Sequence, residues 1–151
     1  MKTIYIGLGS NMGDRETSLK SAIAALSPEI TVTKISSMTE TEPMYNTQQP
    51  KFLNVVCEAQ TELAPLQVLH KLQAAEHDGG REANTHNQPR PIDLDLLFYG
   101  DEVVKTPELT IPHPKLAERA FVLVPMNEIA PDFVHPVLGV TIAELWNKLK
   151  K

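Results

Sequence analysis

Asp93 and Asp95 are two carboxylates that stand two residues apart inside the otherwise apolar segment 91–99. Side chains alternate across a β-strand, so the pattern predicts a strand over 92–99 with both acids on one face. Two strand rises separate their Cα atoms by roughly 6.6 Å. Two carboxylates on an apolar strand need cations or hydrogen bonds to offset their charge. Mg²⁺ ions shared with nucleotide phosphates would supply the cations. The alternative is a half-exposed strand whose two acids are simply solvated. The other face would hold the apolar residues Ile92, Leu94, Leu96 and Phe98.

Basic residues flank this acidic pair in the sequence. Arg81 and Arg90 bracket a polar segment before it, and His113 and Arg119 follow it. Phosphoryl transfer needs cations that absorb the charge spread over the moving group. Closure of the segment 81–91 over a nucleotide would bring two guanidinium groups to the phosphates, although each arginine could also be an ordinary surface residue. His113 lies between two prolines, which favours a defined orientation; a structural turn histidine is the alternative.

Four short motifs extend this pattern nearly from end to end of the chain. They are IGLGSN at 6–11, FLN at 52–54, PRPIDLD at 89–95, and PHP at 112–114 followed by RAFVL at 119–123. In order and spacing they resemble the 6-hydroxymethyl-7,8-dihydropterin pyrophosphokinase family. The resemblance implies an enzyme of folate biosynthesis that transfers pyrophosphate from ATP to a pterin alcohol, giving AMP and the pterin diphosphate. It also implies ATP as co-substrate and two Mg²⁺ ions as cofactors.

The resemblance assigns roles to single residues. Asp93 and Asp95 would bind the metal ions, and Arg81 and Arg90 would act with them in catalysis. The expected nucleotide contacts are Gln73, Arg81, Arg90, His113 and Arg119. The expected pterin contacts are the stacking rings of Phe52 and Phe121, the edge-reading amide of Asn54, Asp93, and the loop residues Thr41, Pro43 and Met44. Periodicity alone would place both phenylalanines in the core.

The segment 82–89 departs from the family. Members carry further arginines and a Trp-Gly pair there, whereas this chain has EANTHNQP. With fewer cations and no indole, we expect weaker closure over the site and slower turnover, with His86 as a partial substitute. The metal and pterin positions are retained.

Two other functions are open from the residues alone. A ferredoxin-like module could bind a nucleotide or sense a metal without turnover; the altered segment mildly favours it and the acid pair disfavours it. An ordinary kinase would transfer only the γ-phosphoryl group, and would form ADP where a pyrophosphokinase forms AMP.

Hydrophobic periodicity predicts the elements that must position these residues. Strands are expected over 2–8, 30–37, 52–62 and 92–99, and helices over 14–27, from Pro65 to Gly79-Gly80, and from a capping box at 141–144. Long loops are expected at 38–50 and 81–91, and a hairpin turn at Gly100-Asp101 before 102–104. The order β-α-β-β-α-β predicts an α+β fold with a ferredoxin-like βαββαβ core, an added C-terminal hairpin and helices, in one domain over 1–151.

Two further expectations concern local positions. Gly7, Gly9 and Gly13 have neither the ending of a phosphate loop nor Rossmann spacing, so we interpret them as a tight structural turn. The apolar stripe of the second helix should face inward; it includes Leu66, Leu69, Leu72 and either Ala75 or Glu76.

Composition limits the classes of function. The 151 residues carry a formal net charge of −5 and are 42% hydrophobic, as in an ordinary globular domain. The acidic balance argues against a surface for nucleic acid or anionic membrane, so the basic residues should form a local patch. No apolar run has membrane-spanning length, and residues 2–8 fit a strand better than a signal peptide. We therefore expect a cytoplasmic monomer that binds small molecules, with Cys57 as an inert core thiol.

Overall fold

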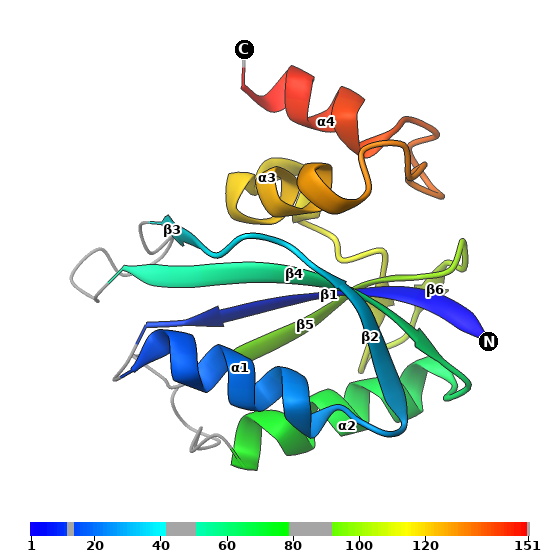
Figure 1. Ribbon diagram of the computed structural model, residues 1–151. Coiled ribbons are helices and arrows are strands. Elements are labelled where there is room, and N and C mark those ends of the chain that lie inside the picture. Colours follow the sequence, from blue (N-terminus) through cyan, green and yellow to red (C-terminus); the bar gives the residue numbers. More distant parts are fainter. Residues whose placement is uncertain (12–13, 42–50, 79–91, 151) are drawn as a thin grey trace.

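The computed structural model describes residues 1–11, 14–41, 51–78 and 92–150 (Figure 1). Its strands are β1 (Lys2–Ser10), β2 (Ile30–Ile35), β3 (Thr39–Thr41), β4 (Phe52–Thr61), β5 (Asp93–Tyr99), β6 (Val104–Lys105) and β7 (Thr110–Ile111). Its helices are α1 (Arg15–Ala25), α2 (Pro65–Asp78), α3 (Ala120–Ile129) and α4 (Ile142–Leu149), with a 3-10 turn at Leu116–Glu118. The predicted loop 81–91 lies outside the described residues.

The main sheet is antiparallel, with the strand order β2-β4-β1-β5. β2 pairs with the second half of β4, and β3 pairs with its first three residues. Helices α1 and α2 cover one face of the sheet, and α3 and α4 cover the other (Figure 1). The described residues thus form a mixed α/β fold with an antiparallel sheet and four helices, as the order of predicted elements requires.

The alternation of side chains along the strands divides the core into two parts. Ile4, Ile6 and Leu8 of β1 pack with the residues of α1 and α2. Tyr5 faces the opposite way and packs with α3 and α4. Cys57 is fully buried in the first part, and burial raises the pKa of its thiol to about 12, which agrees with an inert core residue.

Helix ends follow the local signals in the sequence. The carboxylate of Asp14 accepts the backbone N–H of Thr17 at 3.1 Å and caps α1. α2 begins at Pro65, where the missing N–H breaks no helical hydrogen bond. Thr141 and Glu144 form the predicted reciprocal capping box of α4.

The alternation predicted for 92–99 is wrong at Phe98. The register between β1 and β5 shifts, so that Tyr5 is opposite Phe98 while Ile6 is opposite Leu96. One residue of β5 is therefore extra, and this bulge reverses the strand face from that point. Phe98 packs on the α3–α4 side, where its ring centroid lies 6.2 Å from that of Tyr5.

Two large apolar side chains of β2 and α2 are exposed, and one of them, Leu66, was predicted to face inward. Ile35 ends the edge strand β2 and is 51% exposed, although it is opposite the buried Cys57. Leu66 is 39% exposed, because the buried stripe of α2 runs through Val68, Leu72 and Ala75.

Two connections differ from the prediction. Part of the expected loop 38–50 is the short strand β3, which forms because β4 extends beyond the end of β2 and offers it an open edge. Gly100 adopts a positive φ of 54° in the expected turn, but β6 then pairs with β7 rather than folding back on β5.

In the described ranges, no helix has the length and apolar character needed to span a membrane.

His135 makes the stability of this fold depend on pH. Its imidazole is buried, and Nδ1 accepts the backbone N–H groups of Val137 and Leu138 at 3.1 Å each. Burial lowers the pKa of His135, so the unfolded chain takes up a proton at a higher pH than the folded chain does. The stabilising effect is therefore complete above the ordinary histidine pKa of about 6.5 and decreases as the pH falls below it.

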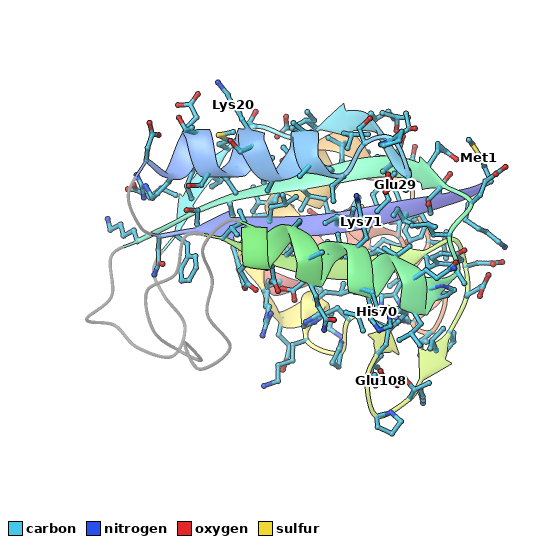
Figure 2. The ribbon with its side chains drawn as sticks, turned by 90° about the horizontal axis from the view of Figure 1, so that it is seen from below. Met1, Lys20, Glu29, His70, Lys71 and Glu108 are labelled. Atoms are coloured by element: carbon cyan, nitrogen blue, oxygen red, sulfur yellow. The ribbon has the colours of Figure 1, made fainter. Side chains whose placement is uncertain are left out.

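We expect the melting temperature to fall between pH 7 and pH 5, and His135→Asn to reduce this dependence, because an amide oxygen can keep the acceptor without titrating. Thermal melts across this pH range are the measurement. His70→Asn is the matched control, since His70 has an exposed side chain on α2 (Figure 2). A dependence that His135→Asn leaves unaltered would assign the acid sensitivity to other groups.

Candidate active site

Polar side chains gather where β1 ends and where β4 and β5 begin. β1 is antiparallel to both neighbours, so these three ends lie together, at the left in Figure 1. Gly9 is opposite Asn54 on one side and Asp93 on the other, and Gly7 is opposite Asp95. Directly paired residues share a face of the sheet, so Asn54, Asp93 and Asp95 all lie on one face.

This face is the one that α3 and α4 cover. Val56 is opposite Gly7, and it packs with residues of both helices. The face therefore has two regions: an apolar region beneath α3 and α4, and the polar region of Asn54, Asp93 and Asp95 at the strand ends. The predicted metal-binding and pterin-reading residues are thus brought together by strand register.

The glycines of β1 form the floor between these side chains. A Cβ on Gly9 would lie 2.9 Å from Asn54 Oδ1 and 3.3 Å from Phe52 Cδ1, so both side chains lean over the bare backbone. The prediction of a tight turn is wrong for Gly7 and Gly9, which lie within a strand; Gly13 lies outside the described residues. A glycine inside an alternating strand indicates close approach of another group, and that signal was present in the sequence.

The segment after β7 brings basic and aromatic residues to the same side of the sheet. The backbone N–H of His113 donates to the carbonyl of Leu97 at 3.1 Å, which holds the segment beside β5. Arg119 precedes the first residue of α3, and Phe121 lies in its first turn. The Arg119 guanidinium carbon lies 5.3 Å from the centroid of the Phe121 ring, and both side chains are half-buried.

His113 lies within electrostatic reach of residues from two elements. Burial lowers its pKa, Arg119 lowers it further, and Asp93 acts in the opposite direction. Nδ1 accepts the backbone N–H of Lys115 at 3.4 Å, which assigns the proton of the neutral ring to Nε2. His113 is thus an uncharged hydrogen-bond donor near neutral pH, a group that can bind a phosphate oxygen.

Glu76 supports the strand that carries the two acids. Its side chain is only 9% exposed, and Oε2 accepts the backbone N–H of Leu94 at 2.8 Å. That N–H lies between Asp93 and Asp95 in the sequence, on the edge of β5 away from β1. The sequence left either Ala75 or Glu76 as the inner residue of this helical turn, and the structure buries both. A glutamate on the inner side of a helix, close to an unpaired strand edge, is the signal for this role.

The other predicted residues are not joined to this group by the described contacts. Gln73 is exposed on α2, which packs on the opposite face of the sheet. The backbone of Thr41 ends β3 opposite Phe52, but its side chain is outside the description. Four predicted residues lie wholly outside the described residues: Pro43, Met44, Arg81 and Arg90.

The carboxylates of Asp93 and Asp95 fit the donor chemistry of Mg²⁺. Both side chains are half-buried on the polar face, and Mg²⁺ in nucleotide enzymes takes one or two carboxylates together with phosphate oxygens and water. Within the part of the chain that the structure describes, no three His, Cys, Asp or Glu side chains converge as a metal site. Phosphate and water oxygens are the usual further ligands of Mg²⁺ in nucleotide enzymes.

Carboxylates and basic groups beside an amide and aromatic rings are typical of a phosphoryl-transfer enzyme whose acceptor is a flat polar ring. Comparison with known families agrees with this class. The model of the 7,8-dihydro-6-hydroxymethylpterin-pyrophosphokinase family matches residues 5–131, and the chain belongs to this family.

Individual relatives agree with the family match. The chain is 41% identical over 144 residues to the 2-amino-4-hydroxy-6-hydroxymethyldihydropteridine pyrophosphokinase of Aquifex aeolicus, covering 95% of this chain and 90% of that protein. It is 44% identical over 149 residues to the folic acid synthesis protein fol1 of Pneumocystis carinii, covering 98% of this chain but 20% of that protein. The chain thus spans about a fifth of the length of that longer relative.

A solved structure shows the same fold. The crystal structure of Plasmodium falciparum HPPK-DHPS with pteroate superposes with a TM-score of 0.78, covering 97% of this chain and 42% of that chain. The sequences are 17% identical, so this likeness concerns the fold alone.

Proposed function

We propose that this chain transfers pyrophosphate from ATP to the hydroxymethyl group of 6-hydroxymethyl-7,8-dihydropterin, in folate biosynthesis. The observation that carries the proposal is the row of Asn54, Gly9 and Asp93, with Asp95 beside it. An amide that can read a ring edge and two carboxylates that can hold Mg²⁺ lie on one face, across β1 at Gly9, where the Asn54 and Phe52 side chains closely approach the bare backbone. The name of the Aquifex aeolicus relative supports the same reaction.

The pterin would lie against the β4 side of this row. The Asn54 amide offers a donor and an acceptor to the ring edge, and Phe52 and Phe121 offer aromatic faces from β4 and α3. The closeness of Phe52 and Asn54 over Gly9 supports this assignment. Thr41, Pro43 and Met44 remain proposed pocket residues on the grounds of family resemblance.

ATP would lie against the β5 side. Asp93 and Asp95 would hold two Mg²⁺ ions, which when bound neutralise phosphate charge and favour departure of the leaving oxygen. His113 donates from Nε2 to a phosphate oxygen, and Arg119 adds a positive charge beside it. Arg81, Arg90 and Gln73 remain proposed nucleotide contacts from the family resemblance.

The proposed step is a direct displacement. The pterin hydroxyl oxygen bonds to the β-phosphorus, the bond from that phosphorus to the oxygen bridging to the α-phosphate breaks, and AMP leaves with that oxygen. The hydroxyl proton passes to solvent, and no covalent bond to the chain forms. The chain contributes position and charge: it aligns the hydroxyl by holding the pterin, and it stabilises the moving phosphates.

We further propose that residues 1–151 form one domain with a ferredoxin-like core. The strand order β2-β4-β1-β5 and the placement of α1 and α2 on one face support this description.

Product analysis tests the proposed function. Incubation with ATP, Mg²⁺ and the hydroxymethyl-dihydropterin should yield AMP and the pterin diphosphate, separated by ion-exchange chromatography. ADP as the main nucleotide product would identify a γ-phosphoryl kinase instead. Binding of both substrates without any nucleotide product would identify a binding module.

Phe121→Ala should weaken pterin binding by roughly threefold to tenfold, because aromatic stacking contributes about 0.5–1.5 kcal/mol beyond the burial of area. Fluorescence titration with the pterin, run beside a melting curve, measures the effect. Phe133→Leu is the control: this ring packs 5.0 Å from Tyr5 in the apolar region, so its loss should lower the melting temperature and spare pterin affinity. If Phe121→Ala behaves like the control, Phe121 is a core residue only.

A further inference from the structure

One carboxylate ties α3 to the connection between β2 and β3. Both oxygens of Glu128 accept the backbone N–H of Ser37 at 3.0 Å, and Oε2 also accepts the Ser37 hydroxyl at 3.0 Å. Residue 37 lies between the two strands, where its N–H has no place in a strand ladder. A charged acceptor is a strong replacement for that missing partner. Glu128 therefore sets where the chain enters β3.

The adjacent residue ties the same connection to the sheet. The backbone N–H of Val56 donates to the hydroxyl of Ser36 at 2.9 Å, and the Ser36 N–H donates to the Val56 carbonyl at 2.9 Å. The connection is thus held by β4 through Ser36 and by α3 through Ser37. The position of this connection therefore depends on the spacing between the sheet and α3.

β3 carries this position into the candidate site. Thr39 is opposite Asn54, and Thr41 is opposite Phe52. Paired strands constrain each other's backbone and side-chain directions. A displacement of β3 would therefore first move Asn54 and Phe52, the amide and the ring that we assign to the pterin.

The same helix carries the third pterin residue at its other end. α3 has 10 residues, with Phe121 in its first turn and Glu128 in its last. Pro125 removes one internal hydrogen bond, but both residues lie on the same helical segment, so a shift of its last turn can be passed to its first turn. The Glu128 contact thus links the placement of Phe121 to that of Phe52 and Asn54.

The far end of β3 has a separate anchor. Arg15 forms an ion pair with Glu40 at 2.8 Å, and it donates to the carbonyl of Lys51 at 3.0 Å. Loss of Glu128 would leave this anchor in place. β3 should therefore shift rather than detach, and the effect should be moderate.

We propose that Glu128 is a positioning residue for the pterin substrate, acting through Ser37 on the spacing between β3–β4 and the first turn of α3. The inference rests on the proposed function, because it concerns the same pterin site. It predicts a larger effect on the pterin than on ATP: the residues assigned to metal belong to β5 and His113 is held beside it, whereas the contact acts on β3, β4 and α3, and of the described residues assigned to phosphate it is Arg119 that directly precedes α3.

Glu128→Gln is the test. The glutamine amide has an oxygen acceptor at one end and an NH₂ donor at the other, so only one end can still accept a hydrogen bond from Ser37. If the wild-type chain forms AMP, we expect the variant to raise the KM for the pterin about fivefold. This is less than the change of more than about tenfold that corresponds to one charge-assisted hydrogen bond, because the Arg15 anchor limits the shift of β3. The KM for ATP and kcat should stay within about twofold. Ser37→Ala removes only the hydroxyl bond and should act in the same direction more weakly, and the double variant should be no worse than Glu128→Gln.

Glu29→Gln is the matched control. Glu29 is an exposed carboxylate that accepts from Lys71 Nζ at 2.9 Å, and both side chains are seen beside α2 in Figure 2. This variant should leave the pterin KM unchanged. An unchanged pterin KM in Glu128→Gln, or equal increases for both substrates, would overturn the proposal. If the wild type forms no AMP, the proposed function fails, and pterin titration of Glu128→Gln against wild type then decides the positioning role by the same fivefold criterion.

Discussion

Asp95→Asn is expected to reduce kcat at least a hundredfold while the chain stays folded. The substitution keeps the size of the side chain and removes the negative charge that we assign to Mg²⁺. Loss of one electrostatic stabiliser of a transition state commonly costs about a hundred- to a thousandfold in kcat. Asp93→Asn should act in the same direction, because its carboxylate shares the face and lies beside His113. Steady-state kinetics over a range of Mg²⁺ concentrations, with a melting curve for each variant, is the measurement.

Asp101→Asn is the matched control for this prediction. Asp101 follows the other end of the same strand and is exposed, so its variant should keep normal turnover. If Asp95→Asn also keeps near-normal kcat at saturating Mg²⁺, Asp95 is not a metal ligand. The metal-binding role would then be assigned to Asp93 without Asp95.

Gly9→Ala is expected to lower pterin affinity by about fivefold to 150-fold, with little loss of stability. The added methyl group would lie 2.9 Å from Asn54 Oδ1, which is closer than real contacts allow. The displaced atom is the end of a flexible side chain, so the amide can move away at small cost in folding free energy. It would then no longer face the ring edge, and an unmatched polar group in a binding site costs about 1–3 kcal/mol. Pterin titration and thermal melts measure the two effects separately.

Two further variants show whether Gly9→Ala acts through Asn54. The double variant Gly9→Ala with Asn54→Ala should bind the pterin no more weakly than Asn54→Ala alone, because both changes remove the same contact. Gly7→Ala should have a smaller effect, since its methyl group would meet only the Leu97 side chain at an ordinary 3.5 Å. Additive losses in the double variant would show that Gly9 touches the ligand itself.

The sequence by itself determined the features that depend on neighbouring residues. The alternation in 2–8 and 52–62 predicted the strand faces, and Asp93 and Asp95 lie on one face of β5 as their spacing required. The capping box at Thr141 and the proline at the start of α2 predicted helix starts that the structure confirms. These signals act within a few residues, so no knowledge of the fold was needed to interpret them. The motifs also sufficed to identify the family.

The tertiary structure decided what depends on contacts between distant segments. The bulge that turns Phe98 to the α3–α4 side arises from the register of β5 on β1, and β3 exists because β4 offers it an edge. The role of Gly9 became clear only when Asn54 and Phe52 were placed above it. Glu76 and Glu128 looked like ordinary helical acids, yet each accepts a backbone N–H from a strand edge or a strand connection. Such partners are set by how strands and helices pack, so the position of a glutamate in the sequence does not identify the N–H group that it accepts.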